Sequence, residues 1–211
     1  MPRILTIKSI KRQKAWYEIH FDNNVSFAVN DELLLKHQLK IGKSITTDEI
    51  KTIRDLAEYL YLKKKALEIL ARRSISEKNI RQKLQSVKSY NRHIDKVITE
   101  LKKLKFIDDY AYAVKTIQFL ISGNSRSIRY VNQKLYQKGL PPEIIKNAID
   151  DELGEYDELE GALKLGTKKY NTLKNLPQLK AKKRIADFLQ GKGYNWDAIN
   201  GAINRLFEDS D

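Results

Sequence analysis

Basic side chains are the residues of this sequence whose type and spacing most plainly suggest a chemistry. They fall in short clusters, and Lys and Arg clustered in this way neutralise the phosphates of nucleic acids. For a single lysine, a solvated surface position is the simpler interpretation, but the clusters together favour contact with a polyanion. The candidate DNA-binding residues are Lys63, Lys64, Lys65, Arg72, Arg73, Arg81, Lys83, Lys88, Arg126, Arg129, Lys182, Lys183 and Arg184.

The positive charge is concentrated in one part of the chain. The 211 residues carry 40 Lys and Arg against 27 Asp and Glu, a formal net charge of +13. Residues 61–107 contain 14 basic and 4 acidic side chains, whereas residues 108–160 contain 6 basic and 10 acidic ones. A uniform basic coat would indicate only solubility, and this polarised distribution therefore indicates an oriented anionic partner, with nucleic acid the first choice.

Catalytic and metal-binding chemistry finds little support. The carboxylates of Asp108 and Asp109 could be ligands of a nuclease metal, but neighbours on a helix point about 100° apart and do not converge on one ion. We expect them to cap a helix N-terminus instead. His20, His37 and His93 lack the spacing of metal ligands, and the chain has no cysteine. We therefore predict no metal, no cofactor, no catalytic residue and no enzymatic activity.

Two further groups of residues could suggest a binding site, but the residues around them do not support it. Gly42-Lys43-Ser44 is similar to the end of a phosphate-binding loop, but His37 stands where that loop needs a glycine. The acidic residues between Asp150 and Glu160 have no histidine nearby, and we expect most of them to be solvated surface. The weaker alternative is a contact with a basic surface, either on a protein partner or on the basic part of this chain, residues 61–107.

A helical unit that occurs three times must position the cations. In residues 128–149 one helix ends at Gly139 and the next begins at Pro141-Pro142, as glycine and proline preferences predict. The first copy has Lys88-Ser89 in place of the glycine, and its apolar turn residue is Tyr90. One unit cannot bury its own apolar face, so neighbouring units must stack. The matching apolar positions are Ile80, Leu84, Ile94, Val97 and Ile98, then Val131, Leu135, Ile145, Ala148 and Ile149, then Ile185, Leu189, Ile199, Ala202 and Ile203.

A short β segment precedes the helices. Alternating apolar residues predict strands at Ile4–Ile10, Ala15–Phe21 and Val25–Val29, a helix near Asp31–Gln38, and a possible fourth strand at Ile41–Ile45. The predicted fold is mainly α, with three tandem three-helix repeats in an elongated curved arm after a small antiparallel β module. The predicted divisions are a β module at 1–46, a linking helix at 47–66, and three-helix repeats at 67–107, 108–155 and 156–211. From Thr46 to Leu70 the apolar pattern fits either one long helix or two helices joined near Tyr61–Lys65.

Four motifs in the order of the chain carry a family resemblance. They lie at residues 66–76 (ALEILARRSIS), 106–113 (FIDDYAYA), 133–140 (QKLYQKGL) and 188–194 (FLQGKGY). Together they resemble the RecX family of bacterial regulators of the RecA recombinase, over about residues 60–207. The N-terminal β module is similar to the extension of some Gram-positive members.

The resemblance implies a non-enzymatic modulator in homologous recombination, DNA repair and the SOS response. Such a protein binds the RecA–single-stranded-DNA filament, where it restrains ATP hydrolysis and strand exchange or promotes disassembly. The implied partners are the RecA filament and single-stranded DNA, with non-specific duplex DNA as an alternative. The sequence shows no signal peptide and no apolar run of membrane length. We therefore expect a cytoplasmic monomer with no membrane partner.

Two other functions remain alternatives at this point. A helix-turn-helix regulator of transcription would read duplex DNA with Arg, Asn or Gln near the start of a recognition helix. The helices after Gly139 and Gly193 instead begin with Pro-Pro-Glu-Ile and Asn-Trp-Asp-Ala, which disfavours base reading. A protein-binding scaffold is the third class, and DNA binding with a steep salt dependence would separate it from the others.

Overall fold

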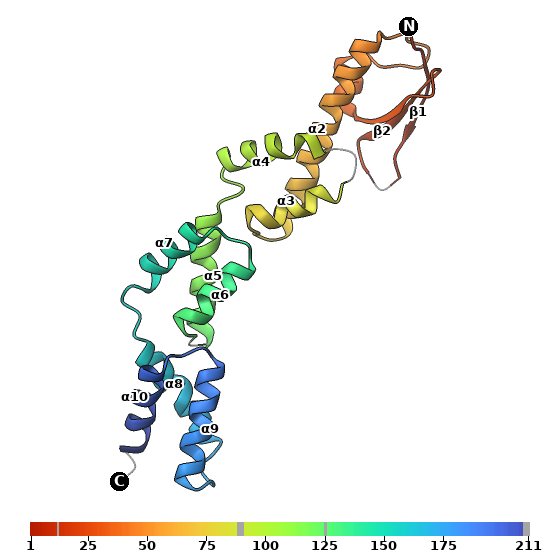
Figure 1. The fold of residues 1–211 in the computed structure, drawn as a ribbon. Coiled ribbons are helices and arrows are strands. Elements are labelled where there is room, and N and C mark those ends of the chain that lie inside the picture. The colour runs from red at the N-terminus through yellow and green to blue at the C-terminus, as the bar shows by residue number, and fades with distance from the viewer. Residues whose placement is uncertain (12, 88–90, 125, 209–211) are drawn as a thin grey trace. The chain divides into compact units, whose positions relative to one another are not determined.

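The fold consists of a small sheet followed by helices (Figure 1), and the computed structural model describes residues 1–11, 13–87, 91–124 and 126–208. Within these residues no helix is both long and apolar enough to span a bilayer. The elements are β1 (Ile4–Ser9), β2 (Trp16–Phe21), β3 (Ser26–Asn30), α1 (Asp31–Lys36), α2 (Thr47–Arg72), α3 (Glu77–Gln85), η1 (Asn91–His93), α4 (Ile94–Lys103), α5 (Asp109–Asn124), α6 (Ile128–Gln137), α7 (Pro142–Leu153), α8 (Glu158–Asn171), α9 (Gln178–Gly191) and α10 (Trp196–Glu208).

The three strands form an antiparallel sheet in the order β1-β2-β3. Ile19 lies opposite Ile7 of β1 and Phe27 of β3, and it is fully buried against the first half of α2. The three predicted strands and the short helix after them are confirmed. The possible fourth strand is wrong, because the sheet has three strands and this segment forms one isolated bridge, Arg3 with Ser44, with backbone hydrogen bonds beside it.

Helix α2 is one continuous helix of 26 residues, which decides between the two alternatives that the apolar pattern allowed. It begins with a capping box. The Glu49 amide donates to the Thr46 hydroxyl at 3.2 Å, and the Thr46 amide donates to the Glu49 carboxylate at 2.9 Å. Donation to the Glu49 carboxylate from the Thr46 amide, and then from the Thr46 hydroxyl at 2.9 Å, holds the pKa of the Glu49 carboxyl below its usual value.

In the described residues the helices follow in three successive sets, α2 with α3 and α4, α5 with α6 and α7, and α8 with α9 and α10, and the repeated apolar positions lie in their interiors. All of the matching positions are buried except Ile149, which is partly buried. Helices α5, α6 and α7 pack on one another, as do α8, α9 and α10, while α2 packs on α4. The repeated apolar pattern therefore predicts the interior of the helical part correctly.

Glycine ends the second helix of the second and third sets. Gly139 has φ +79° and Gly193 has φ +90°, in the left-handed region that glycine adopts without strain. After each glycine the next amide reaches back to a helix carbonyl, from Leu140 to Leu135 at 3.4 Å and from Tyr194 to Leu189 at 3.3 Å. The predicted turns are confirmed here. Their counterpart in the first set, residues 88–90, lies outside the described residues.

The chain divides into two compact units. One contains Met1–Arg73 and Ile80–Phe106, so it combines the sheet, α2, most of α3 and α4. The other contains Ser74–Asn79 and Ile107–Asp211, so it combines the start of α3 with the second and third helix sets.

Candidate nucleic-acid interface

The second helix of each set carries many of the candidate cations. We call α3, α6 and α9 the middle helices. Lys78, Arg129 and Lys183 occupy the same position in the three copies, 51 and 54 residues apart, and all three are exposed. Helix α6 has no acidic residue, and α9 has Asp187 as its only one. The middle helices thus present a cationic surface that recurs with the repeat.

Two of the middle helices start at a repeated joint. The buried Ser76 hydroxyl donates to the Lys138 carbonyl at 2.5 Å, and the Asp109 carboxylate accepts from the Glu77 amide at 2.7 Å. One set later, the buried Ser127 hydroxyl donates to the Lys192 carbonyl at 3.1 Å. There the Glu158 carboxylate accepts from the Ile128 amide at 2.7 Å. The residues that play the same role in the two joints are therefore Ser76 and Ser127, Asp109 and Glu158, and Lys138 and Lys192.

This joint decides how an anion can approach the middle helices. A free helix N-terminus binds phosphate through its unpaired amides and its dipole. In α3 and α6 a carboxylate already accepts from the first amide, at Glu77 and at Ile128. Phosphate contacts must therefore come from side chains along the exposed flanks of these helices.

The same hydrogen bonds explain the carboxylates Asp108 and Asp109. Asp108 accepts from the Ala111 amide at 2.8 Å and caps α5, as predicted. Asp109 also caps a helix, but the helix is α3, to which it is joined only through folding. Among the described residues, no group of three or more His, Asp or Glu side chains is arranged to hold a metal ion.

Three adjacent candidate cations on α2 all have partners within the fold, and Lys64 and Lys65 share the Glu68 carboxylate, at 3.8 and 3.0 Å. Lys63 pairs with Glu100 of α4 at 2.7 Å, and Lys65 pairs with Glu68 at 3.0 Å. The Lys64 ammonium lies 5.6 Å from the centre of the Trp16 ring. About a third or less of each lysine side chain is exposed, and the three ammonium groups already have partners in the fold, Lys63 on α4 and the other two on Glu68 of α2.

Lys63 belongs to a seam between α2 and α4 that perturbs two ionisable groups. Its ammonium, followed by the Tyr59 phenol, lowers the pKa of the Glu100 carboxyl through hydrogen bonds. Burial, together with donation to Glu100, raises the pKa of the Tyr59 phenol to about 12. Lys96 lies over the Tyr59 ring, 4.6 Å from its centre. These contacts stabilise the packing of α2 on α4. They also engage Lys63 and Lys96, which the sequence alone would place on an open basic surface.

The remaining candidates in the first half differ in their exposure. Arg72 and Arg73 are exposed at the end of α2, and Lys83 is exposed on α3. Arg81 is part-buried and pairs with Asp95 of α4. Lys88 lies outside the described residues.

On the second and third sets, the cations are divided between packed and exposed positions. The Arg126 guanidinium lies over the Tyr130 ring at 4.7 Å, and the Lys182 ammonium lies 5.0 Å from the centre of the Phe207 ring. Arg129, Lys183 and Arg184 are exposed. The candidates that the structure leaves exposed are therefore Arg72, Arg73, Lys83, Arg129, Lys183 and Arg184.

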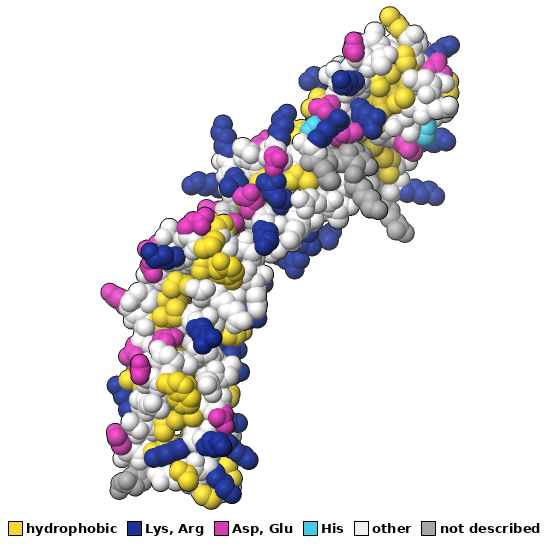
Figure 2. All heavy atoms as spheres, viewed as in Figure 1, with side chains coloured by type: hydrophobic (Ala, Val, Ile, Leu, Met, Phe, Trp, Pro, Cys, Tyr) yellow, Lys and Arg dark blue, Asp and Glu magenta, His cyan; other side chains and the backbone are white. Residues whose placement is uncertain are grey.

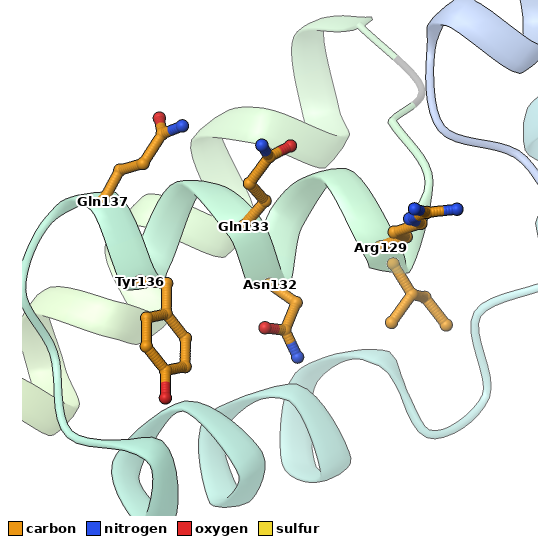
Figure 3. Close-up of a pocket in the computed structure, with 6 residues that line it drawn as sticks. Arg129, Asn132, Gln133, Tyr136 and Gln137 are labelled. Atoms are coloured by element: carbon orange, nitrogen blue, oxygen red, sulfur yellow. The ribbon is translucent and has the colours of Figure 1, made fainter.

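Arg129 also belongs to a groove of about 680 Å³ along α6 (Figure 3). Arg129, Gln133 and Gln137 rise from one side of the helix, and Asn132 and Tyr136 point toward α7. Amide and guanidinium groups are the side chains that hydrogen-bond to base edges and phosphates. The groove is thus polar without carrying negative charge.

The acidic stretch runs from the end of α7, with Asp150, Asp151 and Glu152, to the first turn of α8, with Glu158 and Glu160. Figure 2 shows acidic side chains over this part of the chain. Asp151 accepts from the Tyr110 hydroxyl at 2.6 Å, and Glu152 accepts from the Gln118 amide at 3.0 Å. The hydrogen bond to Asp151 is the main cause that raises the pKa of the Tyr110 phenol. Part of this acidic stretch therefore fastens α7 to α5.

Several residues of interest were missed at the level of sequence. Lys78 would have been found by aligning the three copies, because it matches Arg129 and Lys183. Phe119 is 74% exposed on α5, beside Lys115 of the same helix and Lys134 and Lys138 near α6. These lysines are dispersed in the sequence, and only the packing of α5 on α6 brings them together.

Comparison with known proteins agrees with this architecture. A family model described as the third three-helix domain of RecX matches residues 155–203. Among solved structures, the crystal structure of a regulatory protein RecX superposes with a TM-score of 0.68 at 22% identity, covering 99% of this chain and 100% of the other. RecX from Lactobacillus salivarius gives 0.64 at 21% identity, covering 71% and 96%. These two structures share the fold.

Relatives that match along nearly their whole length are named as regulators and not as enzymes. Regulatory protein RecX of Clostridium acetobutylicum is 31% identical over 215 residues, covering 98% of this chain and 97% of the relative. Regulatory protein RecX of Clostridioides difficile is 32% identical over 203 residues, covering 96% and 95%. On this similarity, carried through both the sheet and the three helix sets, the chain belongs to the RecX family of regulatory proteins.

Proposed function

We propose that the protein binds the filament that the RecA recombinase forms on single-stranded DNA and slows its ATP hydrolysis and strand exchange. Membership of the RecX family supports RecA as the partner. The net charge of +13 supports a polyanion as part of the surface that is recognised. A modulator of this kind needs no catalytic residue, because it acts by binding.

The observation that carries the proposal is the recurrence of exposed cations on the middle helices. A filament presents the same phosphate and protein surface many times along its axis, and a chain of repeated units can match that periodicity. Arg129 of α6 and Lys183 and Arg184 of α9 are exposed, and the middle helices carry few acids. Side chains placed in this way contact phosphate oxygens without reading sequence.

A regulator that reads duplex DNA is less well supported. Such a protein would use the helix after the turn, and that helix would present base-reading side chains in its first turn. Here α7 has Glu143 in its first turn, and α10 has Asp197. Carboxylates at these positions repel the phosphates that flank a groove.

The test is RecA-driven strand exchange, together with ATP hydrolysis, in the presence of the purified protein. We expect both rates to fall as the ratio of this protein to RecA rises. A variant with Arg129→Glu, Lys183→Glu and Arg184→Glu should lose most of the effect, because it reverses three exposed cations of the middle helices. If the wild-type protein leaves both rates unchanged at every ratio, the proposed function is wrong.

A matched control separates position from net charge. Lys51 of α2, Lys103 of α4 and Lys146 of α7 are exposed lysines outside the middle helices. Changing all three to Glu alters the net charge by the same amount. This control variant should slow strand exchange nearly as well as the wild type. Equal loss in both variants would show that total charge, and not the middle helices, matters.

A further inference from the structure

A pocket of about 350 Å³ lies between α5 and α6 and is separate from the groove in Figure 3. Tyr112, Phe119 and Leu120 supply its apolar wall from α5. The other lining residues are Ser74, Lys115, Thr116, Lys134 and Lys138. The Thr116 hydroxyl donates to the Tyr112 carbonyl at 2.8 Å, so it serves the helix and not a ligand. The lining is mainly apolar, so the pocket combines an aromatic wall with the aliphatic stems of three lysines.

The charge of the lining is uncompensated. None of the residues that line the pocket is acidic. Within the described part of the chain, no carboxylate forms an ion pair with Lys115, Lys134 or Lys138. The Lys134 ammonium donates to the Gln137 side chain at 3.1 Å and lies 5.5 Å from the centre of the Tyr130 ring. The three lysines bring positive charge to a mainly apolar pocket, and the lining contains no carboxylate that offsets it. An occupant that carries negative charge therefore complements this lining.

Phe119 indicates what else the occupant brings. Its side chain is 74% exposed, although Ala113 and Ile117 of the same helix are buried in the core. An exposed phenyl ring that lines a pocket together with three lysines matches a ligand that has a flat apolar face and an anion a few ångströms away. A nucleotide of single-stranded DNA has both, because its base is free to stack and its phosphate is adjacent. Duplex DNA offers the phosphates but keeps its bases stacked.

We propose that this pocket binds a nucleotide of single-stranded DNA, with the base stacked on Phe119 and the flanking phosphates held by Lys115, Lys134 and Lys138. The proposal deepens the proposed function and rests on it, since it names the site at which the DNA strand of the filament is held. The exposed face of α6 continues the path, because Gln133, Gln137 and Arg129 follow Lys134 around that helix. A strand leaving the pocket thus meets amide and guanidinium groups and no carboxylate of α6.

The test is binding of fluorescent oligo(dT) to the full-length protein at two salt concentrations. Phe119→Ala should lower the affinity at least about fivefold, the lower limit for loss of one stacked base. Phe119→Trp should retain the affinity, and the emission of the added indole should be quenched on saturation with unlabelled oligo(dT). Lys115→Gln combined with Lys138→Gln should reduce the salt dependence of binding. Because these side chains are exposed, thermal unfolding should be unchanged.

Phe106 provides the matched control, since it is a phenylalanine that is 55% exposed and lies outside the pocket. Phe106→Ala should bind oligo(dT) as the wild type does. Equal affinity of Phe119→Ala and wild type would overturn the proposal, as would an equal loss of affinity in Phe106→Ala. Emission of Phe119→Trp that responds to an acidic peptide containing phenylalanine but not to oligo(dT) would also overturn it, by assigning the pocket to a protein segment.

Strand exchange keeps this inference distinct from the proposed function. If the wild type slows strand exchange while Phe119→Ala binds oligo(dT) normally, the pocket assignment fails and the proposed function stands. If the wild type has no effect on strand exchange, the proposed function fails whatever the pocket binds.

Discussion

At the scale of single residues, two constraints meet at Gly139. Its φ of +79° lies in the left-handed region, which costs a residue with a Cβ atom about 1–2 kcal/mol. A Cβ atom built there would also lie 2.8 Å from Cδ of Lys78, whose stem crosses the turn. Glycine is therefore required both for the turn and for the close approach of α3.

We expect Gly139→Ala to lower the free energy of unfolding by about 1–2 kcal/mol, because the left-handed backbone is strained and Lys78 must move. Urea denaturation followed by circular dichroism measures the change. Gly191→Ala is the control, since that glycine ends α9 without positive φ and a Cβ atom there meets nothing within 4 Å. Its effect should stay within about 0.5 kcal/mol. Similar losses in both variants would contradict this explanation.

The raised pKa of the Tyr59 phenol should make the stability of the fold depend on pH in the alkaline range. Burial and the hydrogen bond to Glu100 raise its pKa to about 12 from the ordinary value of 10.0. Because the folded pKa is the higher one, the unfolded chain loses this proton first as the pH rises. The stability from this group is complete below about pH 10 and is lost as the pH rises toward 12.

Tyr59→Phe removes this dependence. Urea denaturation of the wild type and the variant from pH 8 to pH 11 should show a constant difference in unfolding free energy below about pH 10. Above that pH the wild type should lose stability faster than the variant, because the variant has no phenol to ionise at this position. Parallel curves throughout the range would mean that Tyr59 titrates alike in the folded and unfolded chain.

At the scale of elements, the joint between helix sets is the feature that fixes where α3 and α6 begin. The hydroxyl of Ser76 or Ser127 accepts from an amide in the first turn of the helix. The same hydroxyl donates to a carbonyl in the turn of the next set. The first backbone amide of the capped helix donates to a carboxylate on the first helix of that next set. In the third set the matching position is Ala181, and α9 begins earlier, after Pro177. The joint thus belongs to the starts of α3 and α6.

Ser127→Ala should destabilise the protein by about 1–2 kcal/mol. The variant loses the cap of α6, and it leaves the Lys192 carbonyl without its donor. The unfolding free energy from urea denaturation provides the measurement. Ser86→Ala is a matched control, because the exposed Ser86 hydroxyl donates only to the Lys83 carbonyl. We expect its effect to be within about 0.5 kcal/mol, and a comparable loss there would refute a special role for the joint.

Periodicity predicted the elements well, because apolar residues at helical or strand spacing report directly which face is buried. The strands, the turns at Gly139 and Gly193, and the cores of the helix sets follow from it. Local patterns could not predict that Asp109 caps α3, since that partner lies 32 residues away. The apolar pattern of Ile41–Ile45 predicts a strand. In the structure this segment is a loop, and its one bridge to the start of the chain is between Ser44 and Arg3.

Charge clusters predicted the candidate site less completely, because a sequence does not show which cations are already paired. The adjacent lysines Lys63, Lys64 and Lys65 point at a carboxylate of α4, an indole and a carboxylate of α2. Successive residues of a helix differ by about 100° in direction, so a run of three cannot form one patch. Conversely, Lys115 and Lys134 are far apart in the sequence and join one pocket through packing.

At the scale of the whole molecule, charge acts through the number of phosphates that are neutralised. The logarithm of the binding constant for single-stranded DNA falls with the logarithm of salt concentration, with a slope of about −0.7 for each phosphate contacted. A net charge of +13 attracts DNA at long range, but only cations that touch phosphate contribute to this slope. The slope therefore counts contacts independently of total charge.

We expect replacement of Arg129, Lys183 and Arg184 by Gln to make the salt slope for oligo(dT) shallower by about 2, since three phosphate contacts are removed. Fluorescence anisotropy at four or more salt concentrations measures the slope. Replacement of Lys51, Lys103 and Lys146 by Gln lowers the net charge equally, yet it should leave the slope unchanged, because these three lysines lie outside the middle helices and are not among the candidate DNA-binding residues. Two equal reductions would mean that DNA is held by a diffuse field over the whole surface. A reduction confined to the first variant would mean that the strand follows the middle helices, where the repeat places its exposed cations.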